Sequence, residues 1–346
     1  MAKPVTSSTL GSEPDTYFYA LARTGSSLAT IGSDDTLRIF DPSTLRSTTT
    51  ARVPGSGLSC LQPISDHTLA TAGRDGTIRL WDPRSCKPTA HITEPHSRSF
   101  SALASHSHIL AAGTESAKEG LADVSVLLYD LRHPSVPLRS YADSHTDSIT
   151  SLSFHPEQPS CVMSGSTDGL VSVFDGNQAD EEEALQVVWN PRSAVHCAGF
   201  LSAGEVYVLT TDEQFVVYPL PTAGEGGCGV VGDGQEGGGG AGGSAVQDFG
   251  DVREKLGCMY VINLLRQPGD QQPLIAYGHN EQQRLGVVHL SSSSSGGPGQ
   301  RGGSWGFGAS VDFPGAHGEE VVRDMLVGEG RAWSCGEDGC VRVWKW

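Results

Sequence analysis

The stretch that decides the fold is LATAGRDGTIRLWDPR, which runs from Leu69 to Arg84. Two short apolar runs flank the turn Arg74-Asp75-Gly76, and this pattern predicts two β-strands joined by a tight turn. The second run ends on the dipeptide Trp81-Asp82. Weaker copies recur along the chain, at 28–41, 109–130, 161–175, 205–220, 273–290 and 332–346. The chain is therefore predicted to be a repeat protein.

One spacing unites the copies. In six of the seven, an Asp stands six positions before an aromatic residue: Asp34 and Phe40, Asp75 and Trp81, Asp123 and Tyr129, Asp168 and Phe174, Asp212 and Tyr218, and Asp338 and Trp344. The sixth copy has Gln283 and His289 instead. Four copies carry a hydroxyl four positions before the Asp, at Thr30, Thr71, Ser164 and Ser334. A His precedes the Asp by 21 to 23 residues at His145 and His317, and His96 lies similarly before the third copy.

These residue types have a structural explanation. The offset places the Asp in the turn and the aromatic at the far end of the next strand, so a His and a hydroxyl can link them across neighbouring strands. Such a network pairs polar groups whose burial would otherwise cost about 1–3 kcal/mol each. The pattern resembles the WD-repeat family, which implies an all-β, seven-bladed WD-repeat β-propeller with a structural tetrad in each blade. The tetrad residues on this basis are Asp34, Thr71, Asp75, Trp81, Asp123, His145, Ser164, Asp168, Asp212, His317, Ser334, Asp338 and Trp344.

The distances between the aromatic anchors fit one domain over residues 1–346. From Phe40 the steps are 41, 48, 45, 44, 71 and 55 residues, against a repeat of roughly 40–45. The two long steps contain a Gly-rich segment, 222–250, and a Ser/Gly-rich segment, 291–308. Neither segment has enough apolar residues to offset its ordering entropy, so both are expected to be disordered inserts within the domain.

The chain ends at Trp346, directly after the third strand of the last copy. A blade needs four strands, and without the fourth the ring would keep an open edge. We therefore expect residues near Lys3 to Leu10 to supply the missing strand by pairing with Val341 to Trp344.

The middle of the chain shows a narrower resemblance. The run from Ser144 to Leu185, with AGTE at 112–115 and DVRE at 251–254, is similar to the WD repeat-containing protein 89 family. Its most specific feature is Asn177 followed by the acidic run Asp180 to Glu183. The resemblance implies a non-enzymatic interaction propeller. The glycine-rich inserts and the degenerate sixth copy depart from the family pattern.

Charge and composition narrow the partner classes. The net charge is −17, with 23 Lys and Arg against 40 Asp and Glu, so the mean field repels nucleic acid and anionic lipid. The eight cysteines form no C-x-x-C pair and no zinc-type Cys/His cluster, which favours free thiols in a reducing compartment. No apolar run approaches the roughly 20 residues of a membrane span. We expect a monomer in the cytoplasm, the nucleus or both.

No residue pattern indicates catalysis, a cofactor or a metal. The Asp, His and Ser/Thr residues recur copy after copy, whereas a catalytic site needs to occur only once. The acidic run at 180–183 lacks fixed neighbours for a metal, and the glycines of 222–250 lack the Lys-Ser/Thr ending of a phosphate-binding loop. The sequence therefore favours a protein that is not an enzyme.

Two arginines suggest one kind of partner. Trp81-Asp82-Pro83-Arg84 and Tyr129-Asp130-Leu131-Arg132 share the pattern W/Y-D-x-R on consecutive copies. This resembles the paired box through which propellers dock as substrate receptors on the cullin-4 RING ubiquitin ligase adaptor, with Arg84 and Arg132 as contacts. The alternative is that each Arg bonds the turn of its own blade.

The other interpretation is a scaffold that binds proteins or peptides of unknown identity on the face where the Asp turns emerge. A rigid ring presents loop side chains at low ordering cost. The candidates on this face are Arg74, Arg98, Thr146, Asp147, Thr167, Glu320 and Glu337. A non-enzymatic protein-interaction scaffold is the function that the sequence favours.

Overall fold

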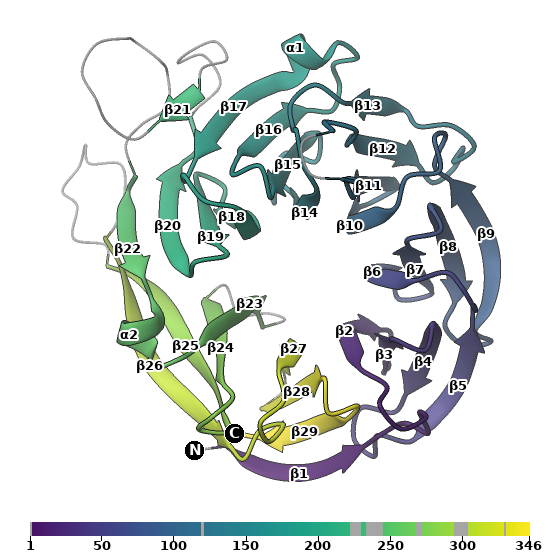
Figure 1. The fold of residues 1–346 in the computed structure, drawn as a ribbon, viewed down its shortest axis with the longest axis vertical. Coiled ribbons are helices and arrows are strands. Elements are labelled where there is room, and N and C mark those ends of the chain that lie inside the picture. The colour runs from purple at the N-terminus through teal and green to yellow at the C-terminus, as the bar shows by residue number, and fades with distance from the viewer. Residues whose placement is uncertain are drawn as a thin grey trace.

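The computed structural model describes residues 2–118, 121–221, 230–232, 245–267, 272–293, 304–328 and 330–346. Seven sheets, each with four antiparallel strands, stand like blades around a central opening, as Figure 1 shows, and one of them has a further parallel strand on its outer edge. The predicted all-β, seven-bladed propeller is confirmed. Two four-residue helices, α1 (Glu181–Ala184) and α2 (Arg253–Leu256), lie at the periphery. Within the described residues, no helix has the length and apolar character to cross a bilayer.

We number the blades along the chain and give their strands from the innermost outward. Blade 1 consists of β2 (Phe18–Thr24), β3 (Ser27–Gly32), β4 (Thr36–Phe40) and β5 (Ser47–Arg52). Blade 2 consists of β6 (Leu58–Ser65), β7 (Thr68–Gly73), β8 (Thr77–Asp82) and β9 (Lys87–Thr93). Blade 3 consists of β10 (Phe100–His106), β11 (Ile109–Thr114), β12 (Val126–Asp130) and β13 (Arg139–Tyr141).

The later blades are built in the same way. Blade 4 consists of β14 (Ile149–Phe154), β15 (Cys161–Ser166), β16 (Val171–Asp175) and β17 (Leu185–Asn190), with β21 (Val230–Gly232) on its outer edge. Blade 5 consists of β18 (Val195–Ser202), β19 (Glu205–Thr210), β20 (Gln214–Pro219) and β22 (Gln247–Asp251). Blade 6 consists of β23 (Tyr260–Arg266), β24 (Pro273–His279), β25 (Arg284–Ser293) and β26 (Ser304–Pro314). Blade 7 consists of β27 (Val322–Gly328), β28 (Arg331–Gly336), β29 (Val341–Lys345) and β1 (Lys3–Ser8).

Blade 7 closes the ring with the two ends of the chain. Strand β1 pairs antiparallel with β29, from Lys3 opposite Lys345 to Ser8 opposite Val341. Figure 1 shows β1 lying along the outer side of β29. The predicted closure is confirmed, because this pairing satisfies the open edge that β29 would otherwise present.

The hydrophobic core lies mainly between blades. One cluster joins Ile78 of blade 2 to Phe100 and Leu127 of blade 3. Another joins Leu209 of blade 5 to Ile275 of blade 6. Because each blade buries its apolar faces against its neighbours, no blade has a complete core alone.

Every innermost strand carries an irregularity at the same place. The register shifts between Phe18/Ala20, Leu58/Cys60, Phe100/Ala102, Ile149/Ser151, Val195/Cys197, Val261/Asn263 and Val322/Asp324. In three blades, the bulged residue's hydroxyl donates to a carbonyl of the next blade: Ser59 to Phe100 (2.7 Å), Ser101 to Ile149 (2.6 Å) and Thr150 to Val195 (2.9 Å). A bulge re-aims a side chain, and here it connects neighbouring blades around the channel.

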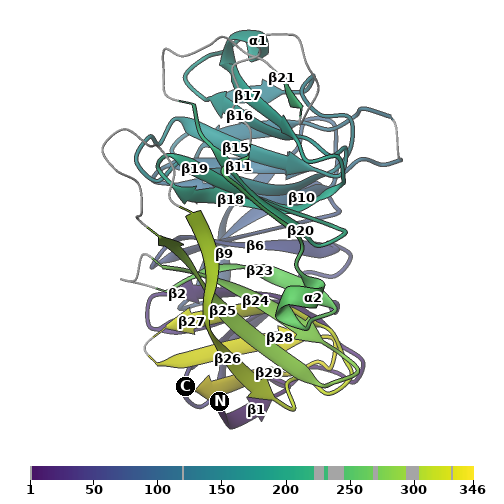
Figure 2. The same ribbon diagram turned by 90° about the vertical axis from the view of Figure 1, so that its left-hand side faces the viewer.

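Parts of the two ranges that were expected to be disordered inserts form strands. β21 (Val230–Gly232) and most of β22 (Gln247–Asp251) lie within the first range, and β25 extends into the second range as far as Ser293, while β26 begins within it at Ser304. The β25–β26 hairpin reaches blade 5, where Phe307 lies 4.8 Å from Phe249 between ring centroids, and Figure 2 shows β25 and β26 running along the side of the ring. The remainder of the predicted inserts, at 222–229, 233–244 and 294–303, lies outside the described residues.

Removal of residues 1–11 tests the closure. We expect the melting temperature to fall by at least about 10 °C, because blade 7 loses its fourth strand and the buried side chain of Leu10. Differential scanning calorimetry measures the change. A synthetic peptide of residues 2–11 added in trans should recover part of the loss, and a scrambled peptide should not. An unchanged melting temperature on truncation would contradict the closure.

Candidate partner-binding surfaces

Two blades contain a complete Asp-His-Ser network. In blade 4, His145 lies 3.0 Å from Asp168 through Nδ1 and 2.7 Å from Ser164 Oγ through Nε2. In blade 7, the corresponding distances from His317 to Asp338 and Ser334 are 2.7 and 2.8 Å. The Trp344 indole N–H also donates to Ser334 Oγ, at 3.1 Å. The predicted tetrad is thus formed in full in blade 7, whereas in blade 4 the aromatic is Phe174, which has no N–H to donate.

These networks link Asp, His and Ser in the same order as a hydrolase triad, but their Ser and His side chains are buried inside the blades. Ser164 and Ser334 are fully buried, and His145 and His317 are 4% and 2% exposed. Burial lowers the pKa of His317 despite its bond to Asp338, so the neutral ring can accept from the Ser334 hydroxyl. Hydroxyls enclosed in this way are out of reach of a substrate.

In two other blades an Arg takes the place of the His. Trp81 Nε1 donates to Thr71 Oγ1 at 2.9 Å, as predicted, but Asp75 pairs with Arg79 at 2.6 Å. Asp34 pairs with Arg38 in the same way. An Arg four positions after the Asp recurs in the sequence. This spacing could have indicated the pairing, because the turn and the following strand place the two side chains on the same side.

Asp123 and Asp212 do not join such a network. Asp123 accepts from Ser116 Oγ at 2.6 Å, and the exposed Asp212 accepts from Ser193 Oγ at 2.6 Å. In blade 3, the buried carboxylate is Glu94, and the predicted network there is replaced by an ion pair with Arg98 at 2.6 Å. His96 is exposed. The tetrad predictions for Asp123 and Asp212 are corrected, because the six-residue spacing does not determine which nearby acid is buried.

Two carboxylates that the sequence did not single out join neighbouring blades. Asp35 and Glu213 have φ of 57° and 64°, at the turn position where Gly76, Gly169 and Gly339 stand in other blades. They accept from the N–H groups of Leu58 and Val261 in the following blades, each at 3.1 Å. Burial raises the pKa of Glu213 to about 7.

A third such carboxylate acts where blade 7 meets blade 1. Asp324 accepts from the Leu21 N–H at 2.7 Å, and burial raises the pKa of its carboxyl to about 6. It belongs to the wall of the central channel, which encloses a cavity of about 390 Å³ lined by residues of all seven innermost strands. Among the described residues, no cluster of three or more His, Cys, Asp or Glu is arranged to hold a metal ion.

The face with the turns between the second and third strands, together with the loops between blades, is the turn face. On it, Arg74, Thr146 and Glu320 are exposed. Arg74 lies 3.9 Å from Glu115, a contact too exposed to hold the side chain. These three predicted contact residues are free to meet a partner.

The other four predicted contact residues have structural bonds. Arg98 pairs with Glu94 and also donates to the Asp123 carbonyl at 3.0 Å and Ser125 Oγ at 2.8 Å. Glu337 pairs with Arg323. Asp147 accepts from the Ser148 N–H at 2.6 Å, and Thr167 donates to the Ser148 carbonyl at 3.4 Å. A role of these residues in partner binding stays a prediction.

Arg84 and Arg132 lie on the opposite face, after the third strands of blades 2 and 3. Each folds back on the Asp two positions earlier, with Arg84 at 3.0 Å from Asp82 and Arg132 at 2.5 Å from Asp130. The hydrogen bond from Arg84 holds the pKa of Asp82 below its usual range. Both arginines remain exposed, at 75% and 62% of the side chain.

A closed ring of seven four-stranded blades with buried Asp-centred networks defines a WD-repeat β-propeller. The family model described as Nucleolar protein 10-like, N-terminal domain, matches residues 20–225, and the chain belongs to this family of WD-repeat propellers. Such propellers are generally protein-interaction scaffolds.

Individual relatives agree with this family. An uncharacterized WD repeat-containing protein of Saccharomyces cerevisiae is 34% identical over 259 residues, which cover 74% of this chain and 58% of the relative. A WD repeat-containing protein 89 homolog of Dictyostelium discoideum is 31% identical over 99 residues, covering 28% of this chain and 27% of the relative. The match to the predicted narrower family is thus partial in length. The chain thus covers less than two thirds of the length of each of these curated relatives.

Solved structures show the same fold. A chain of the mitotic checkpoint complex superposes with a TM-score of 0.69 at 14% identity, covering 100% of this chain and 90% of that one. The computationally designed Ika8 protein gives a TM-score of 0.65 at 17% identity, covering 96% and 97%. At these identities the likeness concerns the fold alone.

Ser334→Ala tests the structural role of the blade 7 network. The change leaves His317 Nε2 and Trp344 Nε1 buried without their shared partner, so we expect the free energy of unfolding to fall by about 1–3 kcal/mol. Urea denaturation measures it. Ser85→Ala, at an exposed turn position, is the matched control and should change stability by less than about 0.5 kcal/mol. Equal effects of the two substitutions would contradict the role of the network.

Proposed function

We propose that this protein is a non-enzymatic scaffold that binds partner proteins through the turn face. The observation that supports this most directly is the contrast on that face between buried networks and free side chains. The Thr146 N–H is held by Asp168 at 2.8 Å, beside buried His145, while the Thr146 side chain points into solvent. The ring therefore holds its contact groups in place before a partner arrives, which lowers the entropic cost of binding.

The same networks support the absence of catalysis. Each Ser-His-Asp chain recurs in a structural position and is closed to solvent, and in blade 7 the hydroxyl oxygen already accepts from Trp344. A nucleophile must be reachable by the atom it attacks. We propose the nucleus as the compartment, since the matching family model is described by a nucleolar protein.

A charge-swapping pair of substitutions tests the turn face. Arg74→Glu with Glu320→Arg reverses two exposed charges without altering the net charge, and we expect partners found by proximity labelling of wild type to be lost or weakened at least fivefold. Arg46→Glu with Glu157→Arg is the matched control on the opposite face, and it should retain them. Identical partner sets from wild type and the turn-face variant would remove the proposal.

A second candidate is a substrate receptor of a cullin-4 RING ubiquitin ligase. It is favoured by the exposure of Arg84 and Arg132 on the same face of neighbouring blades. Surface pairs such as Arg84 with Asp82 are weak, so a partner carboxylate could displace them at little cost.

The ligase hypothesis predicts that Arg84→Ala with Arg132→Ala lowers recovery of the ligase adaptor in a pull-down at least fivefold. Arg253→Ala is the control, because Arg253 makes the same bond to the Asp two positions earlier, at 2.6 Å, but lies after a fourth strand on the turn face. Equal recovery of adaptor by wild type and the double variant, or loss with Arg253→Ala alone, would exclude this candidate.

A further inference from the structure

In blades 2, 3 and 4, one residue in the outer half of the blade fills the gap to the next blade. This residue lies on the fourth strand. It pairs with the third-strand residue that stands three positions before the aromatic residue of the repeat, such as Trp81 in blade 2. The register places Ile92 opposite Ile78, Tyr141 opposite Val126 and Trp189 opposite Val171. These three side chains are buried, at 2%, 2% and 0% exposure, and each fills the space between its blade and the next.

Blade 1 has Ala51 at this position, opposite Leu37. A methyl group replaces a large apolar side chain, and a groove of about 550 Å³ remains between blades 1 and 2. Its floor includes Ala51, Trp81, Cys86 and Pro88. At the boundary of blades 3 and 4, the Tyr141 ring instead stacks on Phe174 with centroids 4.7 Å apart.

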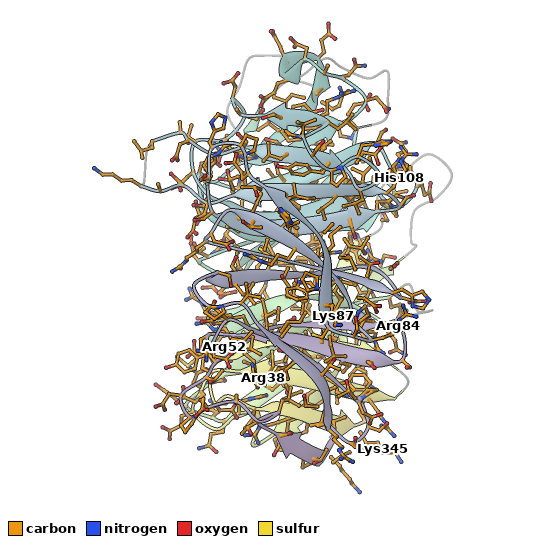
Figure 3. The ribbon with its side chains drawn as sticks, turned by 90° about the vertical axis from the view of Figure 1, so that its right-hand side faces the viewer. Arg38, Arg52, Arg84, Lys87, His108 and Lys345 are labelled. Carbon is orange, nitrogen blue, oxygen red and sulfur yellow. The ribbon has the colours of Figure 1, made fainter. Side chains whose placement is uncertain are left out.

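The groove is lined by basic residues on an acidic protein. Its described lining contains Arg52, Arg79 and His91 and no Asp or Glu, although the whole chain has 40 acidic residues against 23 Lys and Arg. Arg79 is paired with Asp75, whereas no described acid forms an ion pair with Arg52, which is exposed next to Ala51. Figure 3 shows Arg52 on one side of this outer surface and Lys87 and Arg84 toward the other.

The strand beside the groove can accept an extended chain. β5 is the outer edge of blade 1, and its residues alternate between half-buried and exposed from Ser47 to Arg52. Edge strands present unpaired backbone groups to which an added strand can bond. Blade 4 shows this mode of pairing on its own outer edge, where Val188 to Asn190 of β17 pair in parallel with β21.

We propose that the groove between blades 1 and 2 is a docking site for an extended acidic segment of a partner protein. One large apolar side chain of that segment occupies the space over Ala51, where sister blades carry Ile92, Tyr141 and Trp189, and its carboxylates face Arg52 and Lys87. This surface lies on the rim of the ring, so it is separate from the turn face and adds a second contact to the proposed scaffold.

The test uses random 12-residue peptides displayed on phage, selected on the full chain and depleted on an Ala51→Tyr variant whose new ring fills the groove. We expect enriched peptides to combine a large apolar residue with acidic neighbours. Synthetic versions should bind Arg52→Glu at least tenfold more weakly than wild type and should fail to bind Ala51→Tyr. Turn-face variant Arg74→Glu and opposite-face variant Arg46→Glu should bind like wild type.

Several results would overturn the proposal: an empty selection, enrichment of basic peptides, or equal binding to wild type and Arg52→Glu. Binding of a poly-uridine oligonucleotide with the same dependence on Arg52 would assign the groove to nucleic acid instead. Ala51→Tyr should keep or raise the melting temperature because it fills a hollow. If Ala51→Tyr lowers the melting temperature, the double variant Arg52→Glu with His91→Glu is used for the depletion step instead. The same binding results then support or overturn the proposal. Because Arg74 lies on the turn face, binding to the Arg74→Glu variant shows whether a peptide uses the groove or the turn face.

Discussion

The pairing of β1 with β29 is the interaction on which the rest of the structure depends. Each apolar cluster is shared by neighbouring blades, so a ring with one open boundary leaves two blade faces without a partner. β1 completes blade 7, and Leu10 just after it packs with Phe18 of blade 1 and Val341 of blade 7. Closure thus connects residues more than 300 positions apart by backbone hydrogen bonds and by packing, and it makes stability a property of the whole ring.

Within the ring, carboxylates bond both within blades and between them. An Asp in the turn bonds His or Arg of its own blade, and Asp35, Glu213 and Asp324 bond N–H groups of the next blade. A buried carboxylate is costly unless it is paired, so each of these positions accepts whichever donor the neighbouring strands supply. This explains why His, Arg and backbone N–H groups exchange roles among blades while the turn geometry stays constant.

The differences between blades, more than their shared pattern, indicate where partners bind. Repetition gives the blades a shared pattern of strands and turns, which cannot by itself distinguish one surface from another. Ala51 stands where blades 2, 3 and 4 carry a large apolar side chain, and Arg74 and Arg84 emerge on opposite faces of blade 2. A propeller with several such surfaces can hold more than one protein at a time, which suits a scaffold.

The sequence alone determined the number of blades, the turn positions and the strand that closes the ring. Those features depend on local spacing, such as the six residues from Asp75 to Trp81, because turn chemistry and strand alternation act over a few residues. Only the tertiary structure decided that Glu94 and Arg98 replace a His in blade 3, that Glu213 bonds blade 6, and that Ala51 leaves a groove beside Trp81. These outcomes depend on side chains that meet through space from different blades. No spacing within one repeat encodes which neighbour lies across the boundary, so burial, ion pairing and empty volume arise when the ring closes.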